Sequence, residues 1–158
     1  MARPPNSLRS LAPLGDFAVR TARWPEDAES LRTIRREVFI VEQNVPEELE
    51  WDGLDADCRH AIAASTLANG VAIGCGRLLP DGHIGRMAVR EPWRGRGVGA
   101  ALLRHLMDLA LREGHARVVL NAQTHAMRFY ERFGFTSVGE EFMEAGIPHR
   151  TMERILAR

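Results

Sequence analysis

Residues 84–110 read IGRMAVREPWRGRGVGAALLRHLMDLA and carry the most informative pattern of this chain. The apolar run from Ile84 to Val89 is typical of a strand. A turn with three glycines at alternate positions, Gly95 to Gly99, follows it, and apolar residues then recur at helical spacing over about residues 97–113. The pattern predicts a strand, a glycine-rich turn and a long helix, with backbone N–H groups exposed where the helix begins.

This turn has the chemistry of a phosphate or pyrophosphate site. Its glycines let N–H groups converge, the helix N-terminus adds about half a positive charge, and Arg94 and Arg96 add full charges. A Walker loop is set aside because no Lys-Ser or Lys-Thr follows. The dinucleotide fingerprint is formally met by the glycines and Ala100, but residues 117–121 lack the acid expected about 20 positions later. A flexible turn with a helix cap explains one or two glycines, but not three beside two arginines.

The remaining sequence predicts one domain of strands and helices. The chain has 158 residues, and a single domain usually holds about 100–200. We expect a flexible leader over residues 1–15 and a folded domain over residues 16–158. The other predicted elements are a strand at 17–22, a helix from Pro25 past Phe39, a loop or short helix at 42–57, a hairpin of strands 60–66 and 71–79, a strand at 118–120, a helix at 124–133, and strands near 135–143 and 150–156. This order favours an α/β (α+β) fold with a mixed sheet.

Composition excludes several classes of protein. Lys plus Arg and Asp plus Glu both count 21, so the formal net charge is zero and a globally basic nucleic-acid binder is not expected. No apolar run reaches the roughly 18 residues of a membrane span, and the N-terminus lacks the apolar core of a secretion signal. The two cysteines, Cys58 and Cys75, form neither a disulfide framework nor a CxxC metal site. We expect a cytoplasmic protein that has no metal site and binds neither membrane nor nucleic acid.

Several spaced motifs resemble one family. Arg94-x-x-Gly97-x-Gly99 resembles the [Q/R]xxGx[G/A] acyl-CoA pyrophosphate loop of the GCN5-related N-acetyltransferase (GNAT) superfamily, and residues 126–135 are similar to its A-x-x-F-Y-x-x-x-G-F segment. Within the superfamily, the ElaA/YjcF-like bacterial acetyltransferases are the most similar group. The segments that carry this likeness are VFIVEQ at 38–43, EWDGLD at 50–55 and GIPH at 146–149.

The resemblance covers about residues 17–156 and implies both a fold and an activity. The fold would be a single GNAT-type domain with a mixed, mostly antiparallel central sheet, splayed parallel strands and flanking helices. The activity would be N-acetyl transfer from acetyl-CoA to a primary amine, by direct transfer in a ternary complex. The acceptor would be a small molecule or a Lys-type amine, and a homodimer is left open. Two alternatives remain: an acyl-CoA-binding module without turnover, and a nucleotide-binding protein.

The resemblance also implies which residues bind acyl-CoA. The backbone of the glycine turn would hold the pyrophosphate, and the preceding strand would pair with the pantetheine arm between strands that splay at Val89 and Leu120. A backbone N–H near Val89 would polarise the thioester oxygen. Asn121 would hydrogen-bond the arm or a water, although it could equally cap a turn. Phe129 also suits packing of its helix on the sheet. The implied set is Met87, Ala88, Val89, Arg94, Gly95, Arg96, Gly97, Val98, Gly99, Ala100, Asn121, Phe129 and Tyr130.

Acetyl transfer needs an acid for the departing thiolate and a route for the proton of the amine. By the resemblance, the phenol of Tyr130 would lie near the departing sulfur as the acid. Glu50 and Asp52 are the candidate bases, because neighbouring carboxylates raise one another's pKa. They could instead bind a cationic acceptor or form a solvated acidic loop.

The acceptor site is predicted from polar residues in the same segments. His60 and His149 are further candidates for the base, although a lone histidine is more often structural. The expected acceptor-binding residues are Glu42, Gln43, Asp55 and His149.

Overall fold

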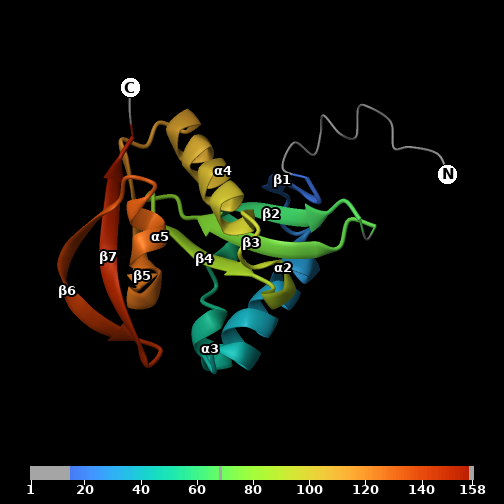
Figure 1. The fold of residues 1–158 in the computed structure, drawn as a ribbon, viewed down its shortest axis with the longest axis horizontal. Coiled ribbons are helices and arrows are strands. Elements are labelled where there is room, and N and C mark those ends of the chain that lie inside the picture. Colours follow the sequence, from blue (N-terminus) through green and yellow to red (C-terminus); the bar gives the residue numbers. More distant parts are fainter. Residues whose placement is uncertain (1–14, 68, 157–158) are drawn as a thin grey trace.

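The computed structural model describes residues 15–67 and 69–156, which form two antiparallel sheets (Figure 1). The four-stranded sheet has the order β1 (Phe17–Ala22), β2 (Arg59–Ser65), β3 (Ala72–Leu78) and β4 (Ile84–Val89). The three-stranded sheet has the order β5 (Arg117–Gln123), β7 (Ile147–Ile155) and β6 (Thr136–Glu144). The helices are α2 (Ala28–Arg35), a π-helical turn (Arg36–Glu42), α3 (Glu47–Glu50), α4 (Val98–Arg112) and α5 (Met127–Glu131).

The two sheets meet at the beginnings of β4 and β5, which run parallel. In the described residues, one bridge joins these strands, between His83 and Val119. Beyond it each strand pairs only with its own sheet: β4 with β3, and β5 with β7. The predicted mixed architecture with splayed parallel strands is therefore confirmed, and the splay divides the sheet into two.

The four-stranded sheet is covered on both faces, with α4 on one and α2 on the other (Figure 1). Alternate residues of β2 point to opposite faces, so Ala61 and Ala63 join the cluster around α4, whereas Ile62 joins the cluster around α2. Double coverage explains why β2 and β3 are nearly continuous apolar runs. The two clusters hold β4 firmly at the boundary with β5.

Most predicted elements are confirmed within a few residues. The predicted first helix changes to a π-helical turn after Arg35, with the N–H of Gln43 bonded to the carbonyl of Val38 at 3.2 Å. The predicted loop or short helix at 42–57 contains α3 and a 3₁₀ turn at Asp55–Asp57. Apart from Gly15, the predicted leader lies outside the described residues. In the part of the chain that the structure describes, no helix is long and apolar enough to cross a membrane.

Candidate functional site

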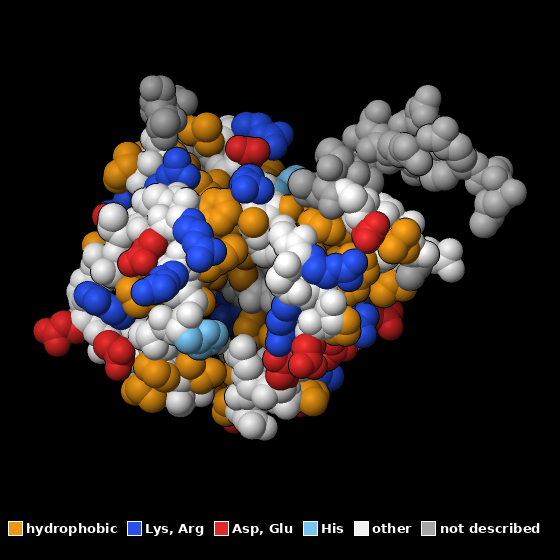
Figure 2. Space-filling view, viewed as in Figure 1, with side chains coloured by type: hydrophobic (Ala, Val, Ile, Leu, Met, Phe, Trp, Pro, Cys, Tyr) orange, Lys and Arg blue, Asp and Glu red, His pale blue; other side chains and the backbone are white. Residues whose placement is uncertain are grey.

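A large cavity occupies the space where β4 and β5 diverge. Its volume is about 1010 Å³, and residues from both sheets, the π-helical turn, α3 and α5 line it. Figure 2 shows the molecule hollowed between the β5–β7–β6 part and the part that carries β1–β4. Three residues of β4, Met87 to Val89, face Leu120 and Asn121 of β5 across this space.

A second cavity of about 380 Å³ lies at the glycine turn. It shares the lining residues Val89 and Arg94 with the first, so the two cavities adjoin at the end of β4. Gly95 and Gly97 have φ of +75° and +87°, and an added Cβ would meet nothing within 4 Å at either position. The turn therefore leaves open space in front of the N–H groups at the start of α4, which suits a phosphate or pyrophosphate.

The two arginines of the turn have acidic partners in the described structure. Arg94 forms a two-bond ion pair with Glu42 at 2.6 and 2.8 Å, which lowers the pKa of that carboxyl. Arg96 stacks over Trp93 at 4.3 Å and reaches Asp16 at 3.2 Å. Arg94 also lines both cavities, whereas Arg96 lines neither. Of the positive charges expected at the turn, that of Arg94 is the better placed.

Strand β4 carries a bulge at the cavity wall. Cys75 pairs with Ala88 and Arg77 with Gly85, so two residues of β4 oppose one of β3. Arg86 is one of these two, and its φ of +52° is in the left-handed region. A bulge leaves an extra residue outside the ladder, so it changes which backbone groups of β4 face the cavity.

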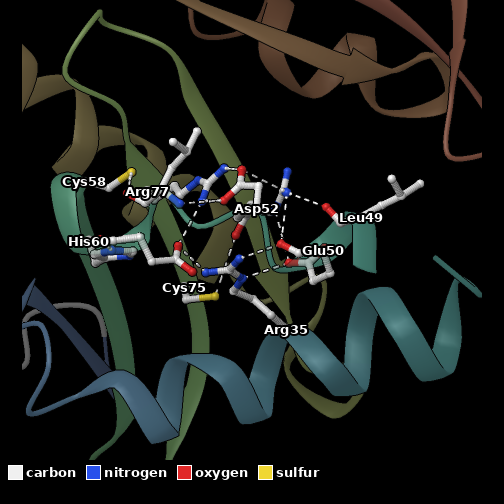
Figure 3. A network of polar contacts seen from close by, with 11 residues as sticks. Arg35, Leu49, Glu50, Asp52, Cys58, His60, Cys75 and Arg77 are labelled. Atoms are coloured by element: carbon white, nitrogen blue, oxygen red, sulfur yellow. Dashed lines mark hydrogen bonds and ion pairs between the residues drawn. The ribbon is translucent and has the colours of Figure 1, made fainter. Parts of the chain in front are cut away.

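The acidic cluster is part of a buried ion-pair network (Figure 3). Arg35 bonds Glu50 at 2.8 Å and Asp55 at 2.7 Å. Arg77 bonds Asp55 at 2.9 Å and Asp52 at 2.5 Å. Arg86 completes the network, with ion pairs to Glu50 at 3.1 Å and Asp52 at 3.3 Å. Three carboxylates thus balance three guanidinium groups.

This pairing weakens the case for a carboxylate base. The bond from Arg77 lowers the pKa of Asp52 far below its ordinary value. Burial raises the pKa of Asp55, but its bonds to Arg35 and Arg77 outweigh burial and lower it. Glu50 is 2% exposed. Glu50 and Asp52 line the large cavity, whereas Asp55 does not. The geometry favours a role in holding α2, α3, β3 and β4 together.

The arginines of this network were not predicted from the sequence. The sequence nevertheless carries a signal for two of them, Arg35 and Arg77. Arg35 follows Leu31 by four residues and precedes Val38 by three, so it takes a position of the apolar helix face. Arg77 similarly interrupts the apolar strand β3. A charge at a position that the pattern reserves for the core must be paired.

Tyr130, the candidate acid, lines the wall of the large cavity. Its ring packs edge-to-face on Phe129 and Phe135, with centroids 5.0 and 6.0 Å apart. Burial raises the pKa of Tyr130 to about 12, so the phenol keeps its proton at neutral pH. Phe129 instead lines the smaller cavity, where its ring would lie 3.5 Å from a Cβ at Gly99.

The predicted polar residues Asn121 and Gln43 also lie at the large cavity. The hydroxyl of Thr151 donates to Oδ1 of Asn121 at 2.9 Å, which orients the amide. Gln123 donates to Gln43 at 3.0 Å, so the π-helical turn and β5 are linked across the space between the sheets. Glu42 lines the cavity while paired with Arg94.

The two candidate histidines differ in position. The ring of His60 stacks on Trp24 with centroids 5.1 Å apart, and its Nε2 lies 2.8 Å from the carbonyl of Asp55. Burial lowers the pKa of His60, and this ring is not part of the cavity wall. His149 is buried and lines the cavity from β7.

Comparison with known proteins gives one consistent result. Residues 26–156 match the family described as "Acetyltransferase (GNAT) domain". The uncharacterized N-acetyltransferase YjcF of Bacillus subtilis is 37% identical over 135 residues, which are 83% of this chain and 94% of YjcF. Protein ElaA of Escherichia coli is 35% identical over 133 residues, which are 79% of this chain and 85% of ElaA.

Solved structures similar to this chain belong to the same kind of protein as the sequence relatives. The crystal structure of Escherichia coli ElaA has a TM-score of 0.75 and 31% identity, and the match covers 88% of this chain and 99% of that one. An acyl-CoA N-acyltransferase from Pseudomonas aeruginosa also has a TM-score of 0.75, with 33% identity over 88% of this chain and 98% of that one.

Proposed function

Because the chain belongs to the GNAT acetyltransferase family, an acyl-CoA-dependent N-acetyltransferase family, we propose that it moves an acetyl group from acetyl-CoA to a primary amine within one ternary complex. The observation that supports this most is that the cavity at the glycine turn adjoins the large cavity that Tyr130 lines. The first cavity suits an anion, and the wall of the second holds a protonated phenol.

The residues that line these two cavities fit acyl-CoA. The N–H groups from Gly95 to Ala100 would hold the pyrophosphate, and the space before Gly97, which a Cβ would fill, leaves room for it. The backbone of Met87 to Val89 would bind the pantetheine arm beside Asn121 and Phe129. When bound, acetyl-CoA supplies a thioester carbonyl that an amine can attack.

Tyr130 would act as the general acid, its O–H bond breaking as the proton moves to the departing sulfur. Burial raises the pKa of this phenol, so it keeps its proton until the sulfur departs.

The acceptor would be a cationic small molecule or a Lys-type amine. Two carboxylates at the rim of the large cavity, Asp81 and Glu144, are exposed and would attract an ammonium group. Assembly as a homodimer and a cytoplasmic location stay predictions.

The test is thiol release from acetyl-CoA with a panel of primary amines. We expect release that depends on the amine, and a loss of about 10²-fold in kcat for Tyr130→Phe, which removes only the hydroxyl. Calorimetry should show that acetyl-CoA still binds to both proteins.

Two results would contradict the proposal. Binding of acetyl-CoA without amine-dependent release would favour a module without turnover. Preference for NAD or ATP over CoA in a competitive titration would favour a nucleotide-binding protein.

A further inference from the structure

The hydrogen bonds of His149 determine which of its ring nitrogens is basic. Nδ1 lies 2.7 Å from the carbonyl oxygen of Ile147. A carbonyl oxygen can only accept, so Nδ1 must carry the hydrogen of the neutral ring. Nε2 then has a free lone pair and is the nitrogen that can take up a proton.

The surroundings of His149 keep the ring in this orientation. The side chain is 7% exposed, and the ring stacks on Phe142 with centroids 5.9 Å apart and planes 23° apart. In the β5–β7 register His149 lies opposite Gln123, and Thr151 lies opposite Asn121 on the same face. His149 therefore shares the cavity wall with the residues expected to contact acyl-CoA.

Glu144 lies beside the basic nitrogen. Its Oε2 is 4.0 Å from Nε2, and its side chain is half exposed. A carboxylate at this distance stabilises an imidazolium. Its exposure also gives the proton a route from the buried ring to solvent.

Other titratable groups around the cavity are less suitable. Asp52 and Glu50 are paired with arginines, and Glu42 is paired with Arg94. His83 lies 3.0 Å from Asp81. His125 lies 2.7 Å from the side-chain oxygen of Gln123 and is solvent-exposed. In the part of the chain that the structure describes, Glu144 of β6 is the acidic residue within 4.0 Å of its Nε2.

We propose that His149 is the general base of the transfer, an inference that rests on the proposed function. An N–H bond of the acceptor ammonium breaks, its electron pair stays on the amine nitrogen, and the proton adds to Nε2. The resulting imidazolium keeps its Nδ1–H bond to Ile147 and faces the carboxylate of Glu144. The neutral amine then carries the lone pair that attacks the acyl carbon.

The central experiment compares wild type with His149→Asn. The amide N–H₂ of asparagine takes the place of Nδ1–H and can still donate to Ile147, but no basic nitrogen remains. We expect kcat/KM for the amine to fall about 10²-fold at neutral pH. The loss should shrink as pH rises, because more of the acceptor is then already deprotonated in solution. The variant's profile should therefore follow deprotonation of the free amine rather than the wild-type profile, and acetyl-CoA binding should be unchanged.

Two further measurements separate this role from a structural one. Long-range ¹H–¹⁵N NMR reads the tautomer directly and should find hydrogen on Nδ1 and none on Nε2 of the neutral ring. Glu144→Gln should cause a smaller loss than His149→Asn, because the basic nitrogen and the Nδ1–H bond to Ile147 remain in place.

The inference is overturned if NMR finds the hydrogen on Nε2, or if His149→Asn keeps the wild-type pH profile. A loss of equal size at every pH would also overturn it, since it would indicate a structural defect. Wild-type protein that releases no thiol with any amine is a different result, because it overturns the proposed function itself.

Discussion

Asp27 illustrates how one side chain can link local structure to pH. It precedes α2 and receives two bonds from Arg20, both of 2.9 Å, and one from the N–H of Arg23 at 2.7 Å. The bonds from Arg20, followed by the Arg23 N–H, lower the pKa of Asp27 to about 2. A carboxyl with a lowered pKa stabilises the fold above its unfolded pKa of about 3.9. That contribution is lost as the pH falls through about 2.

Asp27→Asn should therefore destabilise the protein at neutral pH, and the difference should shrink as the pH falls toward 2 and below. We expect a loss of about 1 kcal/mol or less in the free energy of unfolding, because Arg20 is half exposed and solvent screens the pair. Urea unfolding at several pH values measures it, with Arg20→Gln as the matched control. A difference that persists undiminished at pH 2 would contradict this assignment.

Arg86 combines an unusual backbone conformation with a partly buried charge. Its φ is +52°, and its guanidinium donates to the carbonyls of Leu49 and Glu50, both at 3.1 Å. The left-handed conformation costs a non-glycine residue about 1–2 kcal/mol. The contacts of the guanidinium with the α3 segment offset that cost.

Two substitutions distinguish the stability cost of the backbone conformation from the contribution of the charge. Arg86→Gly and Arg86→Ala both remove the guanidinium, and we expect both to destabilise the protein. The glycine variant should be more stable than the alanine variant by about 1 kcal/mol, because glycine adopts positive φ without strain. Urea unfolding measures the difference. An alanine variant as stable as the glycine variant would show that the bulge relaxes to negative φ.

At the scale of elements, the residues at the start of α4 must both begin the helix and leave space for a ligand. Gly97 is the residue before α4 and has φ of +87°, whereas Gly99 lies within the first helical turn. Gly97→Ala should cost about 1–2 kcal/mol of stability and weaken acetyl-CoA binding, because its Cβ enters the space in front of the N–H groups.

Gly99→Ala is the control within the same turn. The nearest atom to its Cβ would be 3.5 Å away on Phe129, an ordinary contact, and alanine favours a helix by up to about 1 kcal/mol. We expect unchanged or higher stability. Urea unfolding and calorimetry with acetyl-CoA test both variants. Wild-type affinity for acetyl-CoA in the Gly97→Ala variant would argue against a ligand seated on this turn.

Short-range patterns were enough to predict most elements. Alternation gave β1 its exact bounds, Phe17–Ala22, and turn residues marked the hairpin of β2 and β3. The π-helical turn after Arg35 could not be predicted, because its register depends on the packing that places Phe39 and Gln43 at the cavity. The partners of Glu50 and Asp52 were also missed, since Arg35 lies 15 residues from Glu50 and Arg77 lies 25 residues from Asp52 in the chain.

At the scale of the whole molecule, family motifs predicted the splay of β4 and β5 that local patterns could not. Nothing within Val118–Leu120 indicates that β5 leaves β4 after a single bridge. The divergence depends on β7 pairing along the whole of β5, from Arg117 with Ile155 to Gln123 with His149. Such long-range pairing has no short-range signal.

Occupation of the cavity should stabilise the whole protein. A ligand that binds only the folded state, at one hundred times its Kd, adds about 2.7 kcal/mol. For a domain of this size that corresponds to a rise in Tm of about 5–11 °C. Thermal unfolding monitored by circular dichroism with CoA should show this rise, and NAD should not reproduce it. A larger rise in Tm with NAD than with CoA would contradict acyl-CoA as the ligand.

Because a single bridge among the described residues, between His83 and Val119, joins β4 and β5, the two sheets can open locally at this seam. The facing edges of β4 and β5 resemble the two sides of a sheet from which one strand has been left out. Without a ligand between β4 and β5, the β5–β7–β6 part should open as its own cooperative unit. Its amide hydrogens should then exchange sooner than those of β2 and β3. A molecule with amide groups of its own would substitute for that strand and make the two halves exchange as one.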